Sequence, residues 1–159
     1  AWELGKTLKL FAELDWYQWS QFNAGLSLVK IMVDLGVNPP LITADFPNDN
    51  FHDIWVPKVG MELALGGALL RAGYAYHPSP APRQTGVSTL MDSDRQTFGF
   101  GATFPFTGPS ILPYPTALHL SYQLHMLADR TAHKDNPTLP TILYGGQIHS
   151  LSVSMEMKF

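Results

Sequence analysis

The chain of 159 residues is long enough for one domain, and its 14% of charged residues is low beside the roughly 25% of an ordinary soluble domain. A net charge of −3 argues against a nucleic-acid-binding surface. The absence of cysteine excludes disulfides, thiolate metal sites and cysteine nucleophiles, and no apolar stretch reaches the about 18 residues of a transmembrane helix.

The first regular pattern, from Leu8 to Trp16, is an alternation of apolar and mostly polar residues. Successive side chains of a strand point to opposite faces, so the pattern predicts a strand with one apolar and one polar face. The next apolar segment, 26–35, does not alternate. It could continue the first strand past a bulge at 23–25, form a separate strand, or serve as an apolar lid.

A β-hairpin is predicted around Gly66-Gly67, a two-residue turn signal. Pairing around this turn places Leu63 opposite Leu70 and Met61 opposite Ala72 on one face. On the other face it places Glu62 opposite Arg71. Because apolar pairs and an opposite-charge pair then fall on separate faces, we expect strands at 58–65 and 68–76.

Three later segments repeat the alternation over about 9–11 residues each, the length of a tilted strand that crosses a bilayer. Their apolar members are Phe98, Phe100, Ala102, Phe104 and Phe106, then Leu118, Leu120, Tyr122, Leu124 and Met126, then Leu151, Val153, Met155, Met157 and Phe159.

The connections are asymmetric: the turns at 66–67 and 107–116 are short, whereas the connections at about 23–53, 77–96 and 128–140 are long. Short turns at one end and long loops at the other are typical of outer-membrane barrels. A soluble β-sandwich would alternate too, but the pure apolar faces and the mid-strand charges favour a membrane. We therefore interpret 1–159 as one all-β domain, an antiparallel transmembrane β-barrel.

The number of strands is about 6–8. If 26–35 is an extension or a lid, six strands span the membrane, and we favour this count. Six is below the eight strands of the smallest single-chain bacterial barrels. We expect a barrel that is either closed on itself or completed by a second copy, unless strands precede Ala1.

Polar side chains of these strands would face the interior, which in so small a barrel is just wide enough to be filled by side chains. They would form a charged plug without an apolar path for an acyl chain, and breaking a dry pair such as Glu62–Arg71 would cost about 3–5 kcal/mol. The expected inward network is Lys9, Glu13, Asp15, Lys58, Glu62, Arg71, His119, Gln123, Glu156 and Lys158. We expect a hydrophobic ligand instead between protomers or in a groove of the apolar loop residues Leu26, Val29, Val33, Leu35, Leu41, Ile42 and Phe46.

Catalytic and metal sites are not expected. His119 and His125 share a face but lie roughly 20 Å apart at the rise of a strand. The acidic pair of 92–94 is too small a ligand set for calcium, and Asp94-Arg95 is better suited to tying down a loop. Ser121 and His125 are several residues apart without a nucleophile elbow. We predict no catalytic residues, no metal and no cofactor.

Several stretches resemble a known family: 19–22, the Arg-Ala-Gly-Tyr stretch of 70–76 running into Ser-Pro-Ala-Pro at 79–82, 92–95 before 98–101, and a last strand ending in Phe159. The chain resembles the C-terminal half of the FadL/TodX family of outer-membrane transporters for long-chain fatty acids and other hydrophobic compounds. The resemblance implies an integral protein of the Gram-negative outer membrane, with a terminal strand like the one that the barrel-assembly machinery reads.

From the pattern and the resemblance together, we expect a protein, not an enzyme, that binds or passes hydrophobic compounds or lipids such as fatty-acid-like ligands. Its partners would be the membrane, such a ligand and further copies of the chain. The alternative function is an oligomeric, structural, porin-like protein that encloses lipid without a path for solutes.

Overall fold

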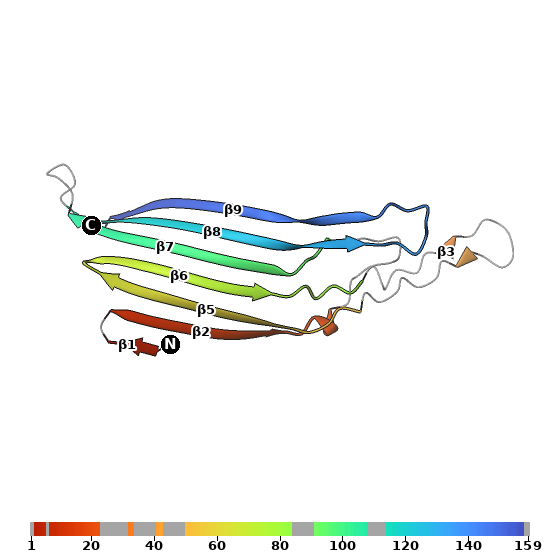
Figure 1. Ribbon diagram of the computed structural model, residues 1–159, viewed down its shortest axis with the longest axis horizontal. Helices are drawn as coiled ribbons and strands as arrows, with labels where there is room; N and C mark the ends of the chain where they lie inside the picture. The colour runs from red at the N-terminus through yellow and green to blue at the C-terminus, as the bar shows by residue number, and fades with distance from the viewer. Residues whose placement is uncertain are drawn as a thin grey trace.

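The computed structural model describes residues 2–5, 7–22, 32–33, 41–42, 50–83, 91–107 and 114–157. One antiparallel sheet of seven strands, in the order β1-β2-β5-β6-β7-β8-β9, makes up most of the described chain (Figure 1). Its strands are β1 (Trp2–Leu4), β2 (Leu8–Tyr17), β5 (Ile54–Leu65), β6 (Ala68–His77), β7 (Arg95–Thr107), β8 (Pro115–Ala132) and β9 (Ile142–Met157). A short 3-10 helix, η1 (Trp19–Gln21), follows β2. No helix in the described ranges is long and apolar enough to cross a membrane.

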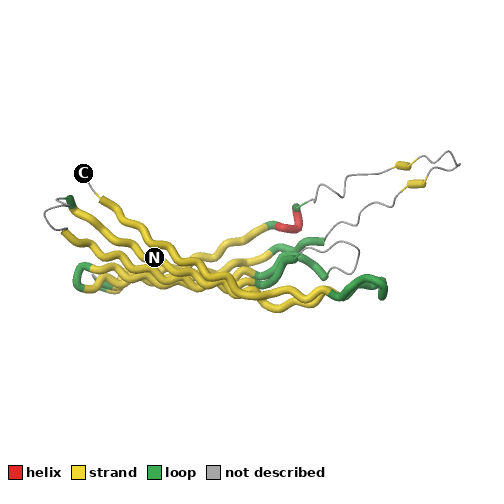
Figure 2. The backbone as a smooth tube through the Cα atoms, turned by 90° about the horizontal axis from the view of Figure 1, so that it is seen from above, coloured by secondary structure: helices red, strands yellow, loops and turns green. Residues whose placement is uncertain are grey.

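The sheet is a single curved layer with two open edges (Figure 2). The all-β, antiparallel prediction is confirmed. Closure into a barrel is not seen: within the described residues, β9 pairs only with β8, and β2 beyond Leu10 pairs only with β5. The short turns lie at one end of the strands and the long connections at the other, as Figure 1 shows.

The hairpin of β5 and β6 is confirmed in its register. Leu63 faces Leu70, Met61 faces Ala72 and Glu62 faces Arg71. Gly66 and Gly67 form the turn with φ angles of 57° and 92°. Two successive positive φ angles match the right-handed twist of the flanking strands, which explains why this pair of glycines terminates β5 so sharply.

Replacing Gly67 by alanine should lower the free energy of unfolding by about 1 kcal/mol, because a side chain is strained at positive φ while the space around the turn is open. Urea unfolding of the protein in lipid vesicles would measure the change. The matched substitution Gly99→Ala, at a glycine whose φ angle is not positive, should leave stability nearly unchanged. Equal losses in both variants would contradict this explanation.

The segment 26–35 does not supply a strand between β2 and β5, because these two strands pair directly from Leu8↔Leu63 to Tyr17↔Ile54. This agrees with the favoured count of six long strands, to which the short β1 adds a seventh. Of the apolar loop itself, the structure describes β3 (Met32–Val33) and β4 (Leu41–Ile42), which pair with each other and not with the large sheet. The rest of 26–35 lies outside the described residues.

The strand ends around the last long connection differ from the prediction. β8 continues to Ala132, and β9 begins at Ile142, so five residues of the predicted 128–140 loop belong to β8 and the connection is 133–141. The cause is a β-bulge between Leu127 and Arg130, which interrupts the period of two. Opposite the bulge, a Cβ on Gly145 would lie within 3 Å of the Asp129 backbone, so only glycine fits there.

On one face of the sheet, the pairing register places apolar side chains opposite one another on neighbouring strands. Apolar residues align along a row that runs through Leu10, Met61, Ala72, Phe100, Tyr122 and Leu151. These side chains are not covered: Phe100 is 54% exposed, and Leu151 is 75% exposed. The buried apolar residues of the described chain are only Ile54, Val56, Ala81 and Ala132. A sandwich core is therefore absent from the described residues, and the apolar face is shaped for contact with lipid.

Large aromatic residues border this apolar face near the long connections. The rings of Trp16 and Trp55 stack at 6.0 Å, and both are about half exposed. The ring centroids of Tyr74 on β6 and Phe98 on β7, closer to the middle of the sheet, lie 5.1 Å apart. Amphipathic rings prefer the headgroup level of a bilayer, so this border marks where the strands leave the apolar region.

Candidate functional site

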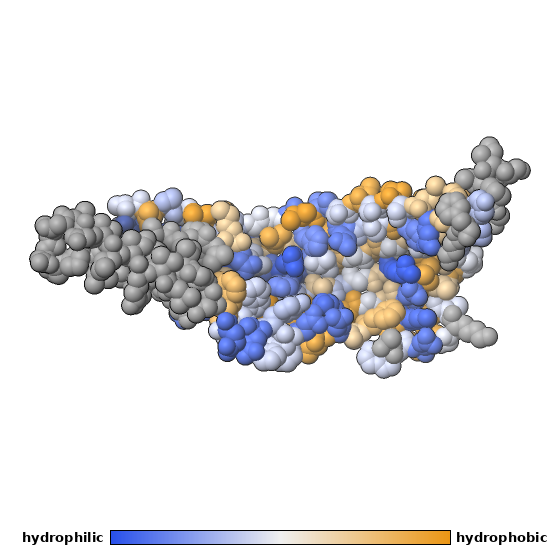
Figure 3. Space-filling view, turned by 180° about the vertical axis from the view of Figure 1, so that it is seen from behind, coloured by the Kyte–Doolittle hydropathy of each residue, from blue (hydrophilic) through white to orange (hydrophobic). Residues whose placement is uncertain are grey.

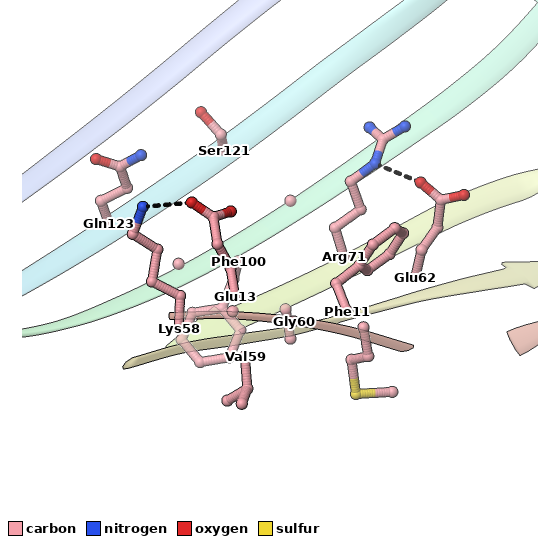
Figure 4. A pocket seen from close by; sticks show the side chains of 15 residues that line it. Phe11, Glu13, Lys58, Val59, Gly60, Glu62, Arg71, Phe100, Ser121 and Gln123 are labelled. Carbon is pink, nitrogen blue, oxygen red and sulfur yellow. Dashed lines mark hydrogen bonds and ion pairs between the residues drawn. The ribbon is translucent and has the colours of Figure 1, made fainter. Parts of the chain in front are cut away.

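The opposite face carries polar side chains around a glycine-floored groove. Gly60, Gly73 and Gly99 are successive partners across β5, β6 and β7, so three neighbouring strands present bare backbone at one level. Phe11 faces Gly60 from β2 and closes one end. The groove has a volume of about 500 Å³ (Figure 4). Figure 3 shows hydrophilic, intermediate and hydrophobic residues mixed on the face of the molecule that it draws.

Two clusters of ion pairs flank the groove. On the side of the long connections, Lys58 Nζ lies 2.9 Å from Glu13 Oε1 and 2.6 Å from Asp15 Oδ2. On the side of the short turns, Arg71 Nε donates a hydrogen bond of 2.9 Å to Glu62 Oε2. Figure 4 shows both clusters rising from the sheet on the same side. Glu13 and Lys58, like Glu62 and Arg71, are direct cross-strand partners, so the register itself makes these contacts.

The β8 side of the groove is mostly uncharged. Ser121 and Gln123 line it there. Nearby, the imidazoles of His119 and His125 bond to threonine hydroxyls of β7: His119 Nδ1 is 3.1 Å from Thr103 Oγ1, and His125 Nδ1 is 2.9 Å from the corresponding Thr97 atom. His119 Nε2 also lies 3.5 Å from Glu156 Oε2. The groove thus separates a charged wall on β2, β5 and β6 from a hydroxyl- and imidazole-rich wall on β7 and β8.

The structure brings most of the predicted inward network onto this one face. Lys9 Nζ lies 3.4 Å from Glu3 Oε1. Glu3 belongs to the short strand β1, which the sequence pattern did not reveal. Lys158 lies outside the described residues. The contacts run between neighbouring strands along the wall, and they leave the groove open.

Replacing Glu62 by glutamine should cost only about 0.5–1 kcal/mol of stability, because the Arg71 side chain is 52% exposed and such pairs are worth little. This is well below the 3–5 kcal/mol expected for a dry pair. Reversible unfolding in urea would measure the difference, with Glu3→Gln as the control at another exposed ion pair. A loss above about 3 kcal/mol would show that the groove excludes water in the membrane.

The other predicted ligand residues are not brought together here. Leu26, Val29, Leu35 and Phe46 lie outside the described residues, and only the backbone pairing of Val33, Leu41 and Ile42 is described. In the described ranges, no three histidine or acidic side chains are grouped so that they could hold a metal ion.

The rim at the long connections carries contacts that the pattern of the strands did not reveal. Trp19, Phe22 and Phe51 pack with ring centroids 5.5–6.1 Å apart. Beside them, hydrogen bonds from the Ser20 hydroxyl and backbone N–H lower the pKa of the Asp53 carboxyl below its ordinary value. Because the folded-state pKa is the lower one, this contact stabilises the rim at neutral pH and is lost as the pH falls through that pKa.

Asp94 holds a loop segment, as expected, through hydrogen bonds with Ser79 and Tyr76. Asp94 Oδ1 accepts a hydrogen bond of 2.8 Å from the Ser79 backbone, and Oδ2 accepts one of 2.8 Å from the Tyr76 hydroxyl. Arg130 joins this cluster from β8. It was missed because the period of two ends at the bulge, and its residues were assigned to a loop.

A single-layer antiparallel sheet with one apolar face and one polar, grooved face is typical of the wall of a transmembrane β-barrel. The chain belongs to the family of outer membrane protein transport proteins (OMPP1/FadL/TodX), whose model matches residues 1–126. No curated protein sequence matches the chain. The protein is accordingly an integral outer-membrane protein of a family that transports hydrophobic compounds and is not enzymatic.

Proposed function

We propose that the glycine-floored groove is the path along which hydrophobic compounds, fatty-acid-like molecules among them, bind and pass. The observation that carries the proposal is the alignment of Gly60, Gly73 and Gly99 on three neighbouring strands. Any larger residues at these positions would project into the space that a ligand needs. A volume of about 500 Å³ falls within the usual range of small-molecule sites.

The groove suits a ligand that has an apolar body and a polar end. Its floor offers peptide groups that already bond within the ladder, and Phe11 offers an aromatic face. Every charged side chain at its border is held by a partner of opposite sign. A hydrocarbon therefore meets the floor, and a carboxylate head would rest near Arg71 or Ser121, where the polar groups lie.

Saturable binding of a radiolabelled long-chain carboxylate by the detergent-solubilised chain tests this function. An uncharged aromatic hydrocarbon should compete, because the uncharged glycine floor and the ring of Phe11 supply most of the contact. If neither compound binds saturably, and vesicles containing the protein take up neither, the proposal fails. The alternative, a structural barrel that encloses lipid without a solute path, would then be supported.

We also propose that a second copy of the chain completes the wall in the membrane. An unpaired backbone group in lipid costs several kcal/mol, so the open edges of β9 and β2 require partner strands there. The strands β9 and β2 run in opposite directions. The β9 edge of one copy can therefore pair in antiparallel fashion with the β2 edge of the next copy. Native mass spectrometry in detergent should show dimers or larger assemblies; a stable monomer would contradict this proposal.

A further inference from the structure

The guanidinium of Arg130 joins two segments that flank a long connection. Its Nη1 donates hydrogen bonds of 2.7 Å to Ser79 Oγ and 2.9 Å to the carbonyl of Asp92. Its Nη2 donates 2.8 Å and 3.0 Å bonds to the carbonyls of Ala81 and Pro82. One side chain of β8 therefore holds the chain that leaves β6 and the chain that enters β7.

The same two segments also bind each other. Ser79 Oγ donates a hydrogen bond of 2.7 Å to Asp92 Oδ2, so this hydroxyl links the guanidinium to a carboxylate. Asp94 accepts bonds from Ser79 and Tyr76, as described above, and its carbonyl accepts a 2.9 Å bond from the Ala128 backbone. We call Ser79, Asp92, Asp94 and Arg130 the rim clasp.

Burial shows that the rim clasp is a packed structure. Ser79 is 8% exposed, and the neighbouring Ala81 and Ser93 are 3% and 5% exposed. These are among the few buried residues of the described chain. Both terminal nitrogens of Arg130 already donate twice, which is all that their hydrogens allow. The Arg130 side chain is thus occupied in holding backbone, and its terminal nitrogens have no hydrogen left for a ligand.

The rim clasp lies just beyond the ends of β6 and β7, two of the strands that floor the groove, and only its Arg130 belongs to a strand, β8. Ser79 is six residues along the chain from Gly73, roughly 20 Å at the rise of a strand. This separation is too large for Arg130 to touch a ligand on the groove floor. The clasp instead fixes the ends of β6 and β7 at the outer rim, where a ligand would have to enter.

We propose that Arg130 is a positioning residue for transport: through the rim clasp it fixes the rim of the wall and controls access of ligand to the groove. This inference rests on the proposed function of the groove. The segments 79–82 and 92–95 lie within the family match, whereas Arg130 lies beyond it. The structure therefore assigns a role to a residue outside the matched region.

Arg130→Gln and Arg130→Lys in the full chain test the proposal, with Arg83→Gln as the control at an exposed arginine of the same rim. Two quantities are compared: the equilibrium Kd of the long-chain carboxylate in detergent, and the rate of its uptake into vesicles. We expect Arg130→Gln to lower uptake about five- to tenfold while Kd changes less than about twofold. Arg130→Lys should restore uptake only in part, because one ammonium group cannot bond all four acceptors that the two terminal nitrogens of Arg130 hold.

Unchanged uptake by a folded Arg130→Gln protein would overturn the proposal, and so would a loss of uptake matched by an equal loss of affinity. If Arg130→Gln does not fold, Ser79→Ala replaces it, because this change removes only the linking hydroxyl; the same separation of uptake from Kd is expected. Absence of binding by the unsubstituted chain would instead refute the proposed function of the groove.

Discussion

Replacing Gly99 by phenylalanine should weaken binding of a long-chain carboxylate at least about tenfold, equivalent to ~1.4 kcal/mol. Beyond its two neighbours in the chain, no atom lies within 4 Å of a Cβ built on Gly99, and its φ angle is not positive. The ring can therefore enter the groove without strain in the backbone. Because the groove is only about 500 Å³, the added ring should take the space of the ligand itself. Equilibrium binding in detergent measures the effect.

Ala102→Phe is the matched control, since it adds the same ring to the same strand on the opposite face. Ala102 lies between Leu70 and Leu120 on the apolar face, where a further ring meets lipid. We expect Ala102→Phe to bind ligand as the unsubstituted chain does. Equal affinities for the Gly99 and Ala102 variants would show that the ligand does not use the groove.

Replacing Leu120 by arginine should destabilise the protein by about 2–4 kcal/mol in a bilayer, the cost of a cation on the lipid face near the midplane. Leu120 is near the middle of the apolar residues of β8, and its partners Ala102 and Val153 are apolar as well. Neither of these cross-strand partners has a side chain that could accept a hydrogen bond from the arginine. Reversible unfolding from lipid vesicles in urea gives the free-energy change.

Ser121→Arg provides the comparison one residue away. Ser121 lies on the polar face between Gly101 and Ser152, where an arginine meets hydroxyls and water. Its cost should stay within about 1 kcal/mol, as is usual for surface changes. A larger loss for Ser121→Arg than for Leu120→Arg would mean that the two faces have been assigned the wrong way round.

Much of the sheet was predictable because the period of two is a property of each strand separately. Leu8 to Trp16 and Phe98 to Phe106 could be recognised as strands without knowledge of their partners. The hairpin register was also predictable, since the two-residue turn at Gly66 leaves only one alignment that pairs Glu62 with Arg71.

The groove and the rim clasp were not predictable for a common reason: both depend on register between distant segments. Gly60, Gly73 and Gly99 are unremarkable within their own strands, and they form a floor only when three strands align. Arg130 follows a bulge that ends the alternation, so its approach to Ser79 leaves no trace in the local pattern. The three residues of β1 are too few for any period to be read.

Site-directed labelling along β8 tests the orientation of the sheet most directly. The sequence has no cysteine, so single cysteines at 118–123 can each carry a spin label without background. In lipid vesicles, labels at 118, 120 and 122 should be accessible to oxygen dissolved in the bilayer. Labels at 119, 121 and 123 should be accessible to a water-soluble nickel chelate. Equal access of the chelate to both sets, or exclusion of oxygen from the even positions, would contradict a lipid-facing apolar surface.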